Sequence, residues 1–151
     1  MISVAHALQA VLNTTQDFGV EKIPFIKSIG RILKETIYAD RDFPPFNRVS
    51  MDGISINYTA FKNGQRSFKI EGVQAAGSAQ LALQDSKNCL EVMTGSVLPD
   101  NTNTVIRYED ITLKNGIAII QIDTVHKGQN IHEKGKDRKV GDLLITQNTK
   151  I

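Results

Sequence analysis

Three short polar segments hold the residues best suited to chemistry, namely residues 44–53, 92–99 and 105–110. In the first segment, the carboxylate of Asp52 could hold a magnesium ion or accept N–H donors from a ligand. In the second, the hydroxyl of Thr94 and the neighbouring backbone N–H groups could donate hydrogen bonds to an oxyanion. Together these segments indicate a binding site for an anionic ligand.

Neighbouring residues could extend this site. Arg48 could add a charge-assisted contact and Ser50 a hydroxyl group, while Gly95 and Ser96 directly follow Thr94. Each polar residue also has a structural interpretation, because loop aspartates and threonines commonly bond to nearby backbone. An isolated arginine is usually a solvated surface residue. The residue types alone leave both interpretations open.

The third segment contains adjacent carboxylates, Glu109 and Asp110. We expect a strand over residues 104–111, and alternation along a strand would turn the two carboxylates to opposite faces. A shared acid–base role is therefore disfavoured, and Glu109 alone remains a candidate for the site.

Composition excludes several other functions. The chain has 151 residues, 40% hydrophobic and 23% charged, with a formal charge of +2. This balance is typical of a globular domain, and the charge is too small to indicate binding to nucleic acid or a membrane surface. Three histidines and one cysteine are too few for a typical structural zinc site. Neither a phosphate-binding Gly-Lys-Ser/Thr loop nor a Gly-x-Ser-x-Gly elbow is present.

The cellular location is expected to be cytoplasmic. The first residues lack the basic and apolar regions of a signal peptide, and the longest apolar runs have only the length of a strand. The single cysteine, Cys89, cannot form an internal disulfide, which suits a reducing compartment.

The elements that must position the site begin with a short amphipathic helix. Val4, Leu8, Val11 and Leu12 recur at helical spacing, and the pattern predicts a helix over residues 3–17 with Ser3 as N-cap and Gly19 as stop. So short a helix needs a partner surface, either the rest of the chain or a second subunit.

The body of the chain is predicted to be mainly β. Alternating apolar residues and turn signals predict strands over residues 53–58, 67–72, 89–94, 104–111 and 143–145. Asn115-Gly116 is the strongest hairpin signal. Periodicity leaves residues 31–39 open between a helix and an extended segment. The charged residues 127–142 are expected to form a solvated connection.

Five ordered motifs resemble the N-terminal region of the MoeA family, which is related to the gephyrin E domain. They are Phe43-Pro44-Pro45-Phe46, Ser50-Met51-Asp52-Gly53, the Met93–Pro99 segment, the Val105–Glu109 segment and the Gly128–Asp137 segment. The resemblance implies a mainly β (α+β) fold of coiled β-sheets with a short N-terminal helix. It also implies a β domain at residues 40–139, with residues 1–39 and 140–151 in a discontinuous, elongated domain. A catalytic MogA-like domain and a C-terminal β domain would lie outside this chain.

The resemblance also implies an activity. Proteins of this family are molybdopterin molybdenumtransferases, cytoplasmic enzymes that insert molybdenum from molybdate into adenylylated molybdopterin with Mg²⁺ and release AMP. Asp52 and Thr94 would be catalytic, with Asp52 as a candidate Mg²⁺ ligand, and we expect the two residues to lie near each other on one open edge of the β domain. The substrate-binding residues would be Arg48, Ser50, Gly95, Ser96 and Glu109. The protein would be a homodimer working with a MogA-like adenylyltransferase, and this chain alone, with half the pocket, would be inactive.

Two other functions fit the same resemblance. The chain could be a non-catalytic binding or scaffold module of the gephyrin type, which an assay of cofactor reconstitution would distinguish. It could also be a dimerisation domain without a ligand. Loss of function without loss of folding in Asp52→Ala would argue against that alternative.

Overall fold

The computed structural model describes residues 2–151, and these form two compact units. One unit comprises residues 38–142, and the other comprises residues 2–37 together with 143–151. The domain limits expected from the sequence, with a β domain at residues 40–139, stay a prediction.

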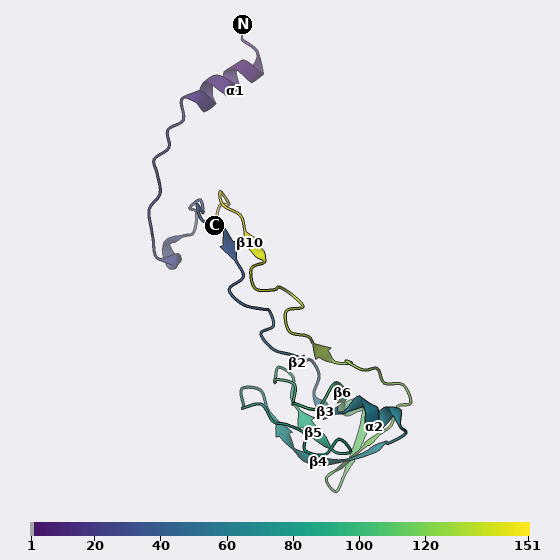
Figure 1. Cartoon of the computed structure of the whole chain (residues 1–151). Helices are drawn as coiled ribbons and strands as arrows, with labels where there is room; N and C mark the ends of the chain where they lie inside the picture. Colours follow the sequence, from purple (N-terminus) through teal and green to yellow (C-terminus); the bar gives the residue numbers. More distant parts are fainter. Residues whose placement is uncertain (1) are drawn as a thin grey trace. The chain divides into compact units, whose positions relative to one another are not determined.

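The larger unit is built on a curled six-stranded sheet with the order β6-β3-β5-β4-β8-β7 (Figure 1). Its strands are β3 (Gly53–Ile56), β4 (Ser67–Gln74), β5 (Cys89–Val92), β6 (Thr104–Arg107), β7 (Ile111–Lys114) and β8 (Ile117–Ile120). All neighbours are antiparallel except β4 and β5. The predicted mainly β class is confirmed.

Both faces of the central strands are covered. Ile54, Ile56 and Phe68 belong to one fully buried cluster, while Val92 and Val105 belong to a second. Because successive side chains along a strand point to opposite faces, the two clusters lie on opposite sides of the sheet. This double burial fixes the register of the strands that carry the site.

The predicted hairpin is present. Asn115 and Gly116 connect β7 to β8 with φ values of 50° and 74°. Both values are positive, as a type I′ turn requires, and Asn-Gly is the dipeptide that adopts them most readily.

The strand predicted over residues 53–58 was too long. β3 ends at Ile56, and a short helix, α2 (Tyr58–Lys62), follows. Asn57 begins this helix because its side chain accepts a hydrogen bond from the Thr59 amide at 3.0 Å. The alternating position of Tyr58 was therefore misleading, since side-chain capping at Asn57 competes with strand continuation.

The expected solvated connection at residues 127–142 also contains regular structure. β9 (Ile131–His132) pairs antiparallel with β2 (Arg48–Val49), which carries one of the predicted site residues. Further along, the Phe43 amide donates to the Arg138 carbonyl at 2.8 Å. Backbone pairing thus ties much of this charged segment to the β body.

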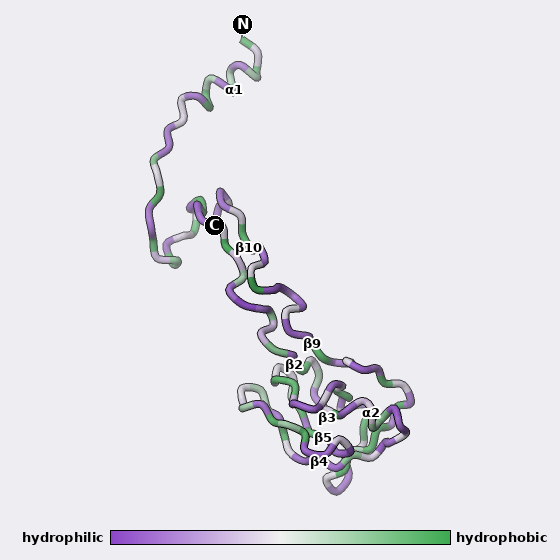
Figure 2. Tube along the Cα trace, viewed as in Figure 1, coloured by the Kyte–Doolittle hydropathy of each residue, from purple (hydrophilic) through white to green (hydrophobic). Residues whose placement is uncertain are grey.

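The smaller unit contains α1 (Val4–Asn13), η1 (Phe25–Lys27) and the end of the chain. Ser3 caps α1, as predicted, by accepting from the His6 amide at 3.2 Å. The helix stops before the predicted residue 17 because the hydroxyls of Thr14 and Thr15 bond back to the carbonyls of the last turn. Figure 2 shows hydrophobic and hydrophilic residues interspersed along α1.

Residues 31–39 are extended, which resolves the alternative that periodicity left open. They include β1 (Ile37–Tyr38), which forms a two-stranded sheet with β10 (Leu143–Ile145). Earlier in this segment, Ile32 forms an antiparallel bridge with Lys150. Within residues 2–151, the structure contains no helix with the length and hydrophobicity needed to traverse a bilayer.

Candidate functional site

Asp52 and Thr94 lie together because the strands next to them are neighbours. Asp52 directly precedes β3, Thr94 follows β5, and Gly53 is paired with Val92 in the antiparallel ladder. The Thr94 backbone amide donates a hydrogen bond to Asp52 Oδ1 at 2.6 Å. Both residues are exposed. The sequence expectation that these two residues share one edge of the β body is confirmed as geometry.

A second neighbouring strand holds Asp52 from its other side. Gly53 is also paired with Arg107 in β6, and the following amide, that of Tyr108, donates to the Asp52 carbonyl at 3.1 Å. Asp52 is therefore fixed twice, through its side chain from the β5 side and through its backbone from the β6 side.

The Asp52 carboxylate is stabilised in its charged form. The Thr94 amide, and after it the Thr94 side chain, lowers the pKa of Asp52 below its ordinary value. Hydrogen bonds to the ionised form have this effect because protonation would weaken them. At neutral pH the site therefore presents a fixed, exposed negative charge.

Close approach of the backbone at Gly53 creates this arrangement. A Cβ atom built on Gly53 would lie 1.9 Å from the Ile106 carbonyl oxygen and 2.9 Å from the Arg107 Cα. Only a residue without a side chain allows β3 and β6 to come this close next to Asp52.

The second predicted segment joins the first through β2. The Gly95 amide donates to the Val49 carbonyl and the Val49 amide donates to the Ser96 carbonyl, both at 2.9 Å. Arg48 and Ser50 flank Val49 and are exposed. The structure therefore gathers most of the predicted residues around one backbone junction. The expectation that backbone N–H groups next to Thr94 donate to an oxyanion is wrong, because the amides of Thr94, Gly95 and Ser96 all bond within the protein.

Ser96 differs from its neighbours because its side chain is completely buried. Its hydroxyl oxygen has no hydrogen-bond partner among residues 2–151. The hydroxyl thus lies inside the protein, whereas the two preceding residues, Thr94 and Gly95, are exposed.

The prediction of one strand over residues 104–111 is wrong for Glu109, because the strand β6 ends before it. Residues Tyr108–Asp110 form a 3₁₀ turn, η2, between β6 and β7. Asp110 accepts two hydrogen bonds from the Arg107 guanidinium, at 2.9 and 3.0 Å, and this bidentate pair stabilises the turn. Glu109 is exposed beside it. The two carboxylates are thus separated by the turn and the ion pair, not by strand alternation.

The structure adds two residues that the sequence analysis did not select. The hydroxyl of Tyr108 donates a hydrogen bond to the Glu91 carboxylate, and both residues are partly buried. Burial first, and then this carboxylate, raises the pKa of Tyr108 above its ordinary value. The signal in the sequence was Glu91 itself, a charged residue within the apolar strand Cys-Leu-Glu-Val.

Asp52 is the single metal ligand that the sequence analysis predicts in this chain. Residues 2–151 contain no cluster of three histidine, cysteine or carboxylate side chains that could hold a metal ion. Mg²⁺ commonly takes one or two carboxylates and completes its shell with water and substrate phosphates. Asp52 therefore fits the role of a single protein ligand and not that of a complete site.

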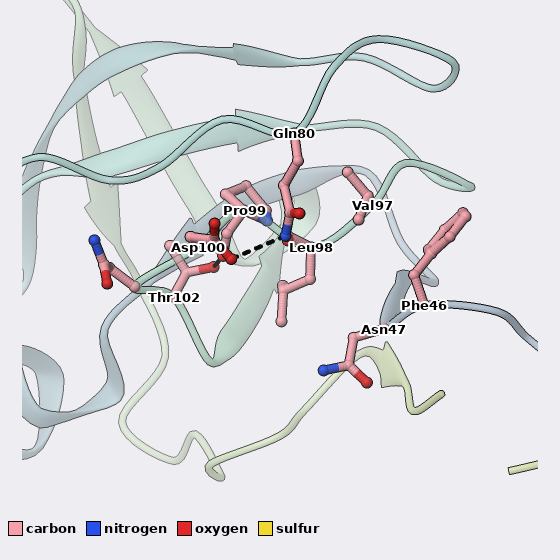
Figure 3. A pocket seen from close by; sticks show the side chains of 9 residues that line it. Phe46, Asn47, Gln80, Val97, Leu98, Pro99, Asp100 and Thr102 are labelled. Atoms are coloured by element: carbon pink, nitrogen blue, oxygen red, sulfur yellow. Dashed lines mark hydrogen bonds between the residues drawn. The ribbon is translucent and has the colours of Figure 1, made fainter. Parts of the chain in front are cut away.

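A separate hollow of about 190 Å³ lies between residues 46–47 and 97–102 (Figure 3). Gln80 spans it, donating to the Leu98 carbonyl at 2.8 Å and to Asp100 Oδ1 at 3.0 Å. None of the predicted site residues lines this hollow. We therefore place the candidate site at the Asp52–Thr94 junction.

Comparison with known proteins points to one family. The family described as "MoeA N-terminal region (domain I and II)" matches residues 2–151. A molybdopterin molybdenumtransferase of Synechocystis sp. is 39% identical over 152 aligned positions, which cover 100% of this chain and 39% of that protein. One from Staphylococcus aureus strain Mu50 is 29% identical over 149 positions, covering 95% of this chain and 35% of that protein.

Solved structures agree with this result. A molybdopterin biosynthesis MoeA protein from Pyrococcus horikoshii superimposes with a TM-score of 0.86 at 27% identity. The match covers 97% of this chain and 40% of that one. The chain thus spans about two fifths of the length of the relatives it matches.

Proposed function

Because this chain belongs to the MoeA family, as its N-terminal region, we propose that it is part of a molybdopterin molybdenumtransferase and acts in molybdenum cofactor biosynthesis. The supporting observation is the junction at which the Thr94 amide binds the exposed Asp52 carboxylate. It places a fixed negative charge at a junction that also carries the exposed side chains of Arg48 and Ser50. In the proposal this edge forms one wall of the substrate pocket, where the carboxylate faces a divalent cation and Arg48 and Ser50 face the anionic substrate.

In the proposed reaction, the full-length enzyme transfers molybdenum from molybdate to adenylylated molybdopterin and releases AMP. Asp52 and Thr94 contact the reacting groups. Arg48, Ser50, Gly95, Ser96 and Glu109 form the substrate-binding set. Exposed Arg48 supplies a positive charge for phosphate or molybdate oxygens, and the exposed Ser50 hydroxyl donates to the same oxygens. Because Ser96 is buried, its contribution is made through the backbone that pairs with Val49.

Mg²⁺ is the divalent cation proposed for this reaction, and it would neutralise negative charge on the substrate phosphates. Asp52 is its proposed protein ligand. This fits the depressed pKa of Asp52, since a carboxylate must be ionised to bind a metal ion.

We further propose that the protein works in the cytoplasm as a homodimer, with a MogA-like adenylyltransferase supplying the adenylylated substrate. The feature that supports self-association is α1, in which no residue is buried. Its four large apolar residues, Val4, Leu8, Val11 and Leu12, are between 51% and 86% exposed. A short, uncharged helix with such a face gains its stability by packing against another surface.

The dimer is tested by placing a charge on this face. In the full-length protein, Leu8→Glu is expected to convert a dimer into a monomer in sedimentation velocity measurements, because a carboxylate buried in an apolar interface is costly. Gln9→Glu is the matched control. Gln9 lies on the polar side of α1, where its amide bonds to Asn13 Oδ1 at 2.8 Å. A monomeric wild-type protein, or a dimer unaffected by Leu8→Glu, would contradict the proposal.

The proposed function is tested by comparing this chain with the full-length protein. We expect residues 1–151 alone to bind adenylylated molybdopterin very weakly or undetectably in calorimetry, and to release no AMP. A single wall leaves the ligand largely hydrated, so the cost of ordering it is not recovered. The full-length protein should bind and turn over under the same conditions. Tight binding by residues 1–151 would place the whole pocket within this chain.

A further inference from the structure

Tyr108 is connected to two different strands at the candidate site. Its backbone amide donates to the Asp52 carbonyl at 3.1 Å, and its hydroxyl donates to the carboxylate of Glu91. Glu91 lies in β5, which is flanked by β3 and β4 in the interior of the sheet. Tyr108 itself begins the η2 turn, directly after the edge strand β6. A single residue thus links the edge of the sheet to its interior.

We propose that Tyr108, held by Glu91, is a positioning residue that fixes the Asp52 carboxylate for the reaction. The inference rests on the proposed function, because it assigns Tyr108 a role in supporting Asp52. The Tyr108–Glu91 pair adds a support that the Thr94 hydrogen bond does not provide. The Thr94 amide bonds to the Asp52 side chain, whereas the Tyr108 amide bonds to the Asp52 backbone carbonyl.

The location of Glu91 explains why this link is effective. Its register partners are Ile54 in β3 and Val73 in β4, and Ile54 is fully buried. Strands in the interior of a sheet are paired on both sides and open less readily than edge turns. The phenol–carboxylate hydrogen bond therefore transfers the rigidity of β5 to the turn whose amide holds Asp52.

Positioning, and not proton transfer, is the role that suits Tyr108. Burial and the Glu91 carboxylate raise the pKa of Tyr108, so its phenol stays protonated at neutral pH. The phenol proton is already donated to Glu91. Reacting groups must be held within about 0.5 Å of their productive positions, and a displacement of about 1 Å can reduce turnover on the order of 100-fold.

The test uses the full-length protein with Tyr108→Phe, which removes the hydroxyl but keeps the ring and the backbone amide. Hydrogen exchange of the Tyr108 amide, whose N–H bonds to the Asp52 carbonyl, is expected to become about 10-fold faster than in the wild type, the effect of weakening one hydrogen bond. In the same variant, kcat for molybdenum insertion should fall about 10-fold, a part of the loss that misplacement can cause, with KM nearly unchanged. Tyr58→Phe is the matched control, since it makes the same change in α2, away from Asp52.

Two changes at Glu91 complete the test. Glu91→Ala removes the acceptor and should reproduce the effects of Tyr108→Phe, whereas Glu91→Gln keeps a carbonyl acceptor and should keep both the exchange of the Tyr108 amide and kcat close to their wild-type values. Exchange of the Tyr108 amide that is unchanged in both Tyr108→Phe and Glu91→Ala would overturn the proposal. If the exchange becomes faster while Asp52→Ala leaves turnover normal, the positioning stands and the proposed role of Asp52 in the reaction fails.

Discussion

Gly53→Ala is expected to destabilise the β body by about 3 kcal/mol or more, the upper range for inserting a methyl group into a well-packed region. The new Cβ would lie 1.9 Å from the Ile106 carbonyl oxygen, a distance that no rotamer change can relieve because the obstacle is backbone. The strands β3 and β6 would have to separate. Thermal unfolding should show a fall of about 10 °C or more in the melting temperature.

Gly72→Ala is the matched control for this prediction. Gly72 lies in β4 of the same sheet, and a Cβ there would meet only the ends of the Leu90 and Leu81 side chains, at 3.5 and 3.9 Å, which are ordinary contacts. We expect its melting temperature to stay close to that of the wild type. If Gly53→Ala melted within 2–3 °C of Gly72→Ala, roughly the shift of a change below 1 kcal/mol, the close approach of β3 and β6 would be refuted.

Local sequence signals predicted the elements that local interactions decide. The Asn115-Gly116 hairpin formed as expected because two adjacent residues supply both positive φ values. Ser3 capped α1 for the same reason, through a hydrogen bond to an amide three residues away. The alternation of apolar residues through Tyr58 wrongly predicted a longer strand, because this pattern gives no sign that the Asn57 side chain caps a helix.

The features that depend on sheet order could not be predicted. The link between Glu91 and Tyr108 requires that β5 and β6 lie on either side of β3, and no local pattern specifies that arrangement. The parallel pairing of β4 with β5 is equally non-local. Glu109 was misassigned for a different reason, because the ion pair that stabilises its turn, between Arg107 and Asp110 three residues later, is a local interaction that apolar alternation does not detect.

The candidate site was predicted in a different way. Nothing in the periodicity connects Asp52 with Thr94, which are 42 residues apart. Their pairing was expected from the order of motifs in a family, and the hydrogen bond between them gives that expectation a physical basis. The sequence indicated which residues to examine, while the adjacency of β3 and β5 explains why they meet.

Asp52→Ala in the full-length protein is expected to reduce molybdenum insertion on the order of 100-fold, the scale found when one preorganised electrostatic group is removed from an active site. Thermal stability should change little. Asp52 is exposed, so the Thr94 amide that loses its acceptor can bond to water instead. AMP release and molybdenum incorporation measure the first effect, and thermal unfolding measures the second. The exposed Asp123, which lies after β8, provides a control as Asp123→Ala.

Asp52→Asn separates the charge of the carboxylate from its hydrogen bond. The amide oxygen can still accept from Thr94, so the loop should keep its geometry, but the negative charge proposed to bind Mg²⁺ is lost. We therefore expect Asp52→Asn to be nearly as inactive as Asp52→Ala.

Because the pKa of Asp52 is depressed, the wild-type carboxylate stays charged above its ordinary pKa and loses its charge only as the pH falls through the lowered value. Turnover between pH 5 and 8, roughly the range of maximal protein stability, should therefore show no inflection from Asp52. Normal turnover by Asp52→Ala would instead make Asp52 a structural residue of the loop, and the scaffold or dimerisation alternatives would then explain the chain better.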